Sequence, residues 1–175
     1  MQLDFSELET KKNPKEAGKR FEELVAAYFR KLKEDPINRI MDVKVEPSGE
    51  GGDGGRDILV TFNINDSVVT FSRKWVIQCK FHNSSISTSH LNKVNIPSLI
   101  HQYSADGYLL ICKDVPAIST TNMFESLRKN CRFCYNYEIW SGSRFKDLLY
   151  TQTDIHKSFF PKYYQETLQF IRNNK

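Results

Sequence analysis

The chain has 175 residues, of which 39% are hydrophobic and 26% are charged, so it can build one domain with a real core and is neither disordered nor membrane-embedded. No apolar stretch approaches the roughly 20 residues that span a bilayer, and the N-terminus lacks the basic start and apolar core of a signal peptide, which together predict a cytoplasmic protein. The formal net charge of +4 is compatible with a polyanionic partner but does not identify one.

The first predicted element is an amphipathic helix that follows a polar arm, residues 1–12. The helix begins at Asn13-Pro14, a typical cap and first-turn pair, and runs to about Lys33, with apolar residues at steps of three and four. Glu22 lies at the edge of the apolar face, where a carboxylate costs free energy unless it is paired or coordinated. Glu22 is therefore either a rim residue paired with a lysine or a functional acid.

Three strands are expected next, at residues 40–46, 57–62 and 68–80. The glycine-rich stretch 49–56 precedes Asp57 and delivers it to the start of the second strand. Alternation along the third strand places Gln78 and Lys80 on one face. If Asp57 lies opposite the region of Gln78, the hairpin is centred near Val68, whereas the turn signal lies nearer Asp66, so we expect a bulge or a longer loop.

The remaining elements alternate between helix and strand. Helices are expected within residues 87–100, with Pro97 interrupting or restarting the first, from about 120 to 131 and from 143; strands are expected at 107–112 and 135–140. This order predicts an α/β fold with a mixed sheet flanked by helices. We assign residues 13–150 to the domain and residues 151–175 to a C-terminal helical extension or a linker to a further module.

The polar residues that the predicted sheet gathers suit hydrolysis of a phosphodiester. Glu22 and Asp57 supply two carboxylates for a divalent metal such as Mg²⁺, which prefers oxygen ligands and keeps several waters. The Gln78 side-chain oxygen, directly or through water, and the Cys79 carbonyl are further ligand candidates. Lys80 can orient an attacking water and neutralise charge on the phosphate.

These residues resemble the Mrr-type branch of the PD-(D/E)xK nucleases, in its Q-x-K variant. The resemblance is carried by Gly18-Lys19-Arg20-Phe21-Glu22, by the stretch from Gly51 to Asp57 and by Gln78-Cys79-Lys80, and it extends over about residues 13–150. It implies a restriction endonuclease-like fold and an active site made of Glu22, Asp57, Gln78 and Lys80.

The resemblance further implies a Mg²⁺-dependent DNA endonuclease, with Mn²⁺ as a substitute, that serves in restriction or antiviral defence. Such domains are often fused to sensor modules, and double-strand cutting by one-strand sites would need a homodimer or higher assembly. Lys19, Arg20, His82, His90 and Lys93 are candidate DNA contacts, although each is also compatible with an ordinary solvated surface.

Two other interpretations remain open. The chain could be a non-catalytic DNA-binding or oligomerisation module that keeps a nuclease-like fold. The pair Cys131 and Cys134 has the spacing of zinc ligands, but no second pair accompanies it, so reduced thiols are favoured.

Overall fold

The computed structural model describes residues 2–9, 14–48 and 54–174. Its regular elements follow the predicted order of helices and strands. The strands are β1 (Ile40–Pro47), β2 (Ile58–Asn65), β3 (Thr70–Lys80), β4 (Gly107–Cys112) and β5 (Asn136–Trp140). The α-helices are α1 (Pro14–Lys31), α2 (Ile96–Gln102), α3 (Ile118–Asn130), α4 (Gly142–Leu149), α5 (Thr153–Phe159) and α6 (Pro161–Asn173), and the 3₁₀ helices are η1 (Phe5–Leu8), η2 (Leu32–Glu34), η3 (Pro36–Asn38) and η4 (Thr88–Leu91). The expected cap Asn13 and the loop residues 49–53 lie outside the described parts of the chain.

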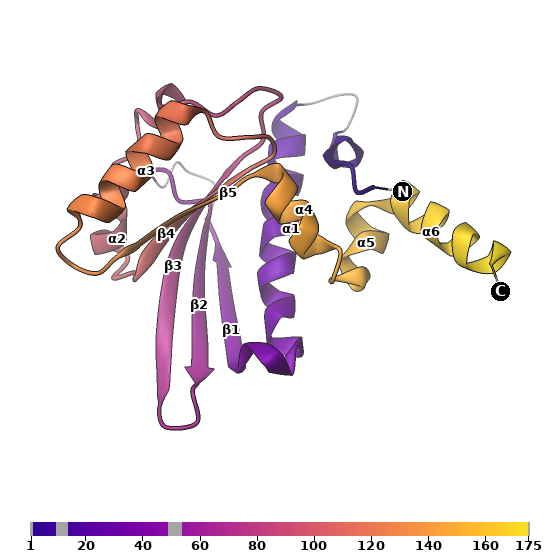
Figure 1. Cartoon of the computed structure of the whole chain (residues 1–175), viewed down its shortest axis with the longest axis horizontal. Coiled ribbons are helices and arrows are strands. Elements are labelled where there is room, and N and C mark those ends of the chain that lie inside the picture. The colour runs from indigo at the N-terminus through magenta and orange to yellow at the C-terminus, as the bar shows by residue number, and fades with distance from the viewer. Residues whose placement is uncertain (1, 10–13, 49–53, 175) are drawn as a thin grey trace.

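The five strands form one mixed sheet in the order β1-β2-β3-β4-β5. The first three strands are antiparallel neighbours, whereas β4 and β5 each run parallel to the strand before them. Helices α2 and α3 lie on one face of the sheet and α1 and α4 on the other, as Figure 1 shows. The predicted α/β fold with a mixed sheet is therefore confirmed.

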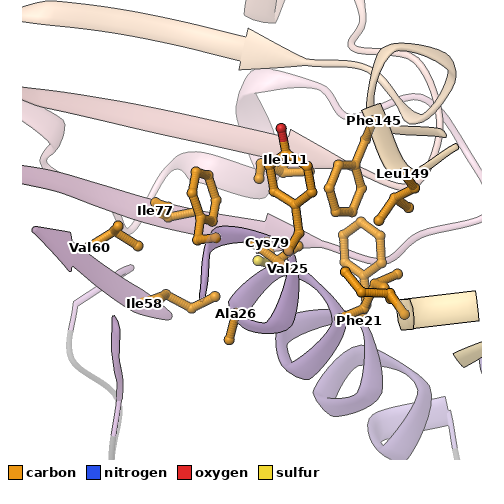
Figure 2. Close-up of a cluster of buried hydrophobic side chains, with 14 of the residues drawn as sticks. Phe21, Val25, Ala26, Ile58, Val60, Ile77, Cys79, Ile111, Phe145 and Leu149 are labelled. Carbon is orange, nitrogen blue, oxygen red and sulfur yellow. The ribbon is translucent and has the colours of Figure 1, made fainter. Parts of the chain in front are cut away.

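The larger core lies between α1 and the sheet. The helix contributes the buried side chains of Phe21, Val25 and Ala26. They belong to the same core cluster as Ile58, where β2 begins, and Cys79, near the end of β3 (Figure 2). The three- and four-residue steps of the α1 side chains produce this stripe. The packing fixes the position of the neighbouring Glu22 relative to the end of β3.

The hairpin between β2 and β3 closes through a longer loop and not through a bulge. Its pairing runs without interruption from Ile58 opposite Ile77 to Asn65 opposite Thr70. Asp66 caps the connecting loop, because its Oδ1 accepts hydrogen bonds from the N–H groups of Val68 and Val69, each at 2.9 Å. Of the two expectations for this hairpin, the longer loop is correct.

The N-terminal segment is a structural part of the core where it is described, and not a free tail. Leu3, Phe5 and Leu8 are fully buried, and the Phe5 ring meets the Phe21 ring edge-on at 5.4 Å. In the sequence, polar residues separate these three apolar residues, so the pattern did not indicate a buried stripe.

The expected C-terminal helix is divided into α5 and α6. Phe160 separates them with φ −131° and ψ 61°, because a residue before proline avoids the helical region, and Pro161 starts α6. The buried Phe160 ring and Ile155 join this segment to the core of α1. Among the described residues, no helix is long and apolar enough to cross a membrane.

The helical region before β4 is also divided. Residues Thr88–Leu91 form η4, and α2 starts afresh at Ile96. Asn95 caps α2, since its side chain accepts a hydrogen bond from the Ser98 N–H at 3.1 Å. Pro97 occupies the first turn, where an N–H group would have no partner within the helix. Pro97 therefore restarts a helix, which is one of the two alternatives that the sequence left open.

Candidate active site

The candidate site lies where β2 begins and β3 ends. The antiparallel pairing places Asp57 opposite the end of β3, where its N–H donates to the Ile77 carbonyl at 3.0 Å. Its Oδ2 accepts a hydrogen bond from the Cys79 N–H at 2.6 Å. These two bonds hold the Asp57 carboxylate beside Gln78 and Lys80, as the sequence predicts.

Glu22 approaches the same place from α1. Its side chain is half-buried, and no described residue forms a hydrogen bond or ion pair with it. Burial raises the pKa of Glu22 to about 7, and the nearby charges of Asp57 and Glu23 act in the same direction, whereas Lys19 and Lys80 oppose them. Among the described residues, Glu22 is therefore not a rim glutamate that forms an ion pair with a lysine.

Asp57 is also held in an environment that disfavours its charge. Burial raises the pKa of Asp57 above its ordinary value, against the opposing effects of the Cys79 N–H and Lys80. Glu22 and Asp57, which we call the carboxylate pair, are thus close enough to influence each other. Burial makes it costly to ionise both carboxylates together, even though Lys80 acts on both of them and Lys19 acts on Glu22.

The carboxylate pair makes the stability of the metal-free protein depend on pH. The folded state keeps a proton on Glu22 up to about pH 7, whereas the unfolded chain loses it near 4.5. The folded state therefore binds more protons between these values, so stability is expected to fall as the pH rises through this window.

We expect Glu22→Gln to stabilise the metal-free protein at pH 8 by on the order of 2 kcal/mol, after allowance for solvent screening. The physical reason is that a neutral amide avoids the cost of ionising a half-buried group. Chemical denaturation in EDTA at pH 4.5 and pH 8 measures the effect, with the exposed Glu125→Gln as control. A variant that is no more stable than wild type at pH 8 would contradict this expectation.

Gln78 is more enclosed than the sequence suggests. Its side chain is 3% exposed, and its Oε1 accepts a hydrogen bond from the Tyr108 hydroxyl at 2.7 Å. An amide oxygen has two lone pairs, so this bond leaves one for another ligand. The role of Gln78 as a metal ligand remains a prediction.

Sequence reasoning missed Tyr108. It lies in β4 opposite Val76, two residues before Gln78 on the same face of β3, so its side chain can reach the Gln78 amide. Its hydroxyl stands out in the apolar run Gly107–Cys112, and a buried tyrosine hydroxyl usually has a partner. That signal was present in the sequence, but the partner depends on which strand lies beside β4.

We expect Tyr108→Phe to slow cleavage roughly 10- to 100-fold, the usual effect of losing a group that orients an active-site ligand. The variant keeps the ring and loses only the bond that fixes the Gln78 amide. Tyr137→Phe is the matched control, since Tyr137 is also buried beneath α3 but its hydroxyl contacts the Cys131 sulfur.

The two variants are compared by cleavage rate across a range of Mg²⁺ concentrations, with unfolding measured alongside. If Tyr108→Phe and Tyr137→Phe have equal cleavage rates and equal Mg²⁺ requirements, Tyr108 has no role in the active site.

The glycine turn before Asp57 is fixed by close packing. Gly55 has φ +108°, and a Cβ atom at this position would lie 2.6 Å from the Val94 side chain and 3.2 Å from Nε2 of Gln78. Only glycine satisfies both the backbone conformation and the space. The described end of the loop is therefore built against β3 and the segment before α2. The earlier residues of the loop, Asp53 among them, lie outside the described parts.

The five candidate DNA contacts lie in two groups. Lys19 and Arg20 precede Glu22 on α1, and the charge of Lys19 reaches Glu22. The rings of His82 and His90 lie 4.9 Å apart, and burial lowers the pKa of His82 with help from His90 and Lys80. Lys93 is exposed beyond η4. Lys19 of the first group is therefore near Glu22, and His82 of the second group is near Lys80.

Comparison with known proteins gives a family and a fold. Residues 15–121, more than half of the chain, match the family model Mrr_cat, which is described as a restriction endonuclease. The solved structure of MspJI restriction endonuclease in complex with a 27-mer oligonucleotide is similar, with 13% identity and a TM-score of 0.50 over 74% of this chain and 27% of that one. No curated protein sequence matches the chain.

A second solved structure also aligns. It is the DNA modification-dependent restriction endonuclease AspBHI, with 13% identity and a TM-score of 0.45 over 87% of this chain and 39% of that one. The chain thus spans well under half the length of both proteins.

Proposed function

We propose that this chain, which belongs to the Mrr_cat family of restriction endonucleases, is a metal-dependent DNA endonuclease that hydrolyses phosphodiester bonds. The observation that carries the proposal is the carboxylate pair, Glu22 and Asp57, with Lys80 beside both. Family membership implies a nuclease, and the site has the groups that this chemistry requires. We further propose a role in cytoplasmic restriction or antiviral defence.

The residues of the site fit a hard divalent cation. Mg²⁺ usually binds through one or two carboxylates and keeps several waters, and the carboxylate pair offers two acids whose pKa values are raised by burial. The described residues form no group of three or more His, Cys, Asp or Glu side chains that could hold a metal, as a closed zinc site would require. We therefore propose Mg²⁺, with Mn²⁺ as a substitute.

The proposed ligands are the carboxylates of Glu22 and Asp57, together with the Gln78 amide oxygen and the Cys79 carbonyl. No described residue bonds Oδ1 of Asp57, and the Cys79 N–H on Oδ2 keeps that carboxylate in place. When bound, such a cation polarises the phosphate and lowers the pKa of a nearby water.

The chain's own groups account for the rest of the proposed reaction. The Lys80 ammonium orients the attacking water and offsets the negative charge that develops on the phosphate. The Tyr108 hydroxyl holds the Gln78 amide in one orientation. Lys19, Arg20, His82, His90 and Lys93 are proposed to contact the DNA backbone around the scissile bond, where positive and polar side chains position nucleic acid without reading its sequence.

The deciding experiment is cleavage of supercoiled plasmid DNA by the purified chain. Mg²⁺ and Mn²⁺ should each support cleavage, EDTA should abolish it, and methylated and unmethylated plasmids are compared in parallel. Absence of cleavage with every divalent metal and both plasmids would refute the proposal. Salt-dependent DNA binding without cleavage would then favour a non-catalytic DNA-binding module.

One active site cuts one strand of the DNA duplex, so cutting both strands calls for two sites. We propose that double-strand cleavage uses a homodimer or higher assembly, and that the chain serves as the nuclease part of a longer protein with a sensor module. The ratio of nicked to linear plasmid as protein concentration rises distinguishes single sites from assembled ones.

A further inference from the structure

Two adjoining cavities form a groove between α2 and α3 that the proposed reaction does not use. One has a volume of about 420 Å³ and the other about 360 Å³, and they share Pro97, Met123 and Leu127 as lining residues. Both volumes lie within the range of ligand pockets. We call this feature the α2–α3 groove.

One end of the α2–α3 groove carries three aromatic rings. His101, Phe133 and Tyr135 lie within 5.3–5.7 Å of one another, measured between ring centroids. Phe133 nevertheless stays 67% exposed, so its ring has a free face. An exposed ring that is held in position by other aromatic side chains is a suitable platform for stacking a planar group.

The polar groups of the groove favour an anionic ligand. Arg132 lines the aromatic end and Lys93 the other end, and no acidic side chain occurs among the described residues that line the groove. Asn92, Asn95 and Asn130 add amide groups that can bond to bases, sugars or phosphates. The combination of stacking rings, cations and amides is typical of surfaces that bind single-stranded nucleic acid.

The groove begins beside the candidate active site. Val94, which lines its Lys93 end, is the residue that packs against Gly55, two positions before Asp57. His90, in the preceding 3₁₀ helix, contacts His82 near Lys80. A strand that leaves the carboxylate pair on this side would therefore enter the groove at Lys93.

We propose that the α2–α3 groove binds a nucleotide of a single DNA strand, whose base stacks on Phe133 while its phosphate lies at Arg132. The choice of nucleic acid as the ligand rests on the proposed function, but the binding requires neither metal nor cleavage. Such a site would hold an unpaired or displaced strand next to the scissile duplex.

The test is fluorescence anisotropy of a labelled single-stranded 15-mer with the full chain in EDTA. Phe133→Ala and Arg132→Gln should each weaken binding about tenfold, as expected for the loss of one stacked base or one phosphate contact. Phe170→Ala and Arg172→Gln are matched controls, because both residues are exposed on α6, Phe170 at 59%. The controls should bind like wild type.

The source of the ligand is resolved by competition with dAMP. Displacement of the labelled strand by dAMP at a comparable concentration assigns the site to free nucleotides, and displacement only by longer oligonucleotides assigns it to a DNA strand.

The inference is overturned if wild type does not bind the 15-mer, or if Phe133→Ala binds it as tightly as wild type does. An apolar protein partner would then be the better occupant. Plasmid cleavage by the same preparations shows separately whether the nuclease proposal stands, since it uses the duplex and the carboxylate pair.

Discussion

Asp57→Asn is expected to slow metal-dependent DNA cleavage on the order of 10³-fold, equivalent to roughly 4 kcal/mol of lost transition-state stabilisation. The amide keeps the shape of the side chain but removes the charge that would attract the cation. Because burial raises the pKa of Asp57, the charge destabilises the folded protein near neutral pH. The Asp57→Asn substitution should therefore not weaken the fold.

The measurement combines single-turnover plasmid cleavage in Mg²⁺, DNA binding in EDTA and thermal unfolding. Asp147→Asn is the matched control, because Asp147 is exposed on α4 and is not among the charges that act on Glu22 or Asp57. A folded Asp57→Asn protein that cuts at the wild-type rate would show that the nuclease site is elsewhere.

Lys80→Ala is expected to lose roughly 10²- to 10³-fold in cleavage rate while keeping most of its DNA affinity. Among the described residues, Lys80 is the one basic residue whose charge acts on both members of the carboxylate pair, so it is placed to act on the reacting water and phosphate. DNA binding depends instead on many phosphate contacts, of which the substitution removes at most one.

Two comparisons separate this role from a general loss of positive charge. Lys157→Ala removes an exposed lysine on α5 and should leave cleavage unchanged. Lys80→Arg retains the charge but replaces a compact ammonium with a planar guanidinium, so it should recover little activity. Full activity of Lys80→Arg would reduce Lys80 to a nonspecific charge, and full activity of Lys80→Ala would exclude it from the reaction.

The two substitutions also distinguish catalysis from stability. Removing a charged group from a protein often weakens folding, which lowers every measured activity together. Asp57→Asn should not destabilise the protein, and Asp57 and Lys80 substitutions should both leave binding in EDTA nearly intact. Loss of cleavage with binding retained is therefore specific to the chemistry.

Local patterns in the sequence were enough to locate the main parts of the candidate site. Helical periodicity placed Glu22 at the edge of a buried face, and strand alternation placed Gln78 and Lys80 on one side of β3. The glycine turn and the hairpin together brought Asp57 to the end of β3. Each of these inferences depends on residues that are close in sequence or joined by one hairpin, and the structure agrees with each placement.

Tertiary packing decided the features that link distant segments. Parallel pairing of β3 with β4 brings the Tyr108 hydroxyl to Gln78, and the segment before α2 brings Val94 to Gly55. The α2–α3 groove likewise exists only because α2 and α3 pack on the same face of the sheet. Nothing in the sequence near any of these residues identifies its partner.

The sequence by itself therefore determined the order of the elements, the fold class and the positions of the acids and lysine that make up the candidate site, because helix and strand periodicities are short-range properties. The tertiary structure alone decided that the N-terminal segment enters the core, that the C-terminal helix breaks at Phe160, and that Gln78 is enclosed by Tyr108. Burial and strand adjacency are set by the free energy of packing the whole chain, to which residues far apart in sequence contribute together.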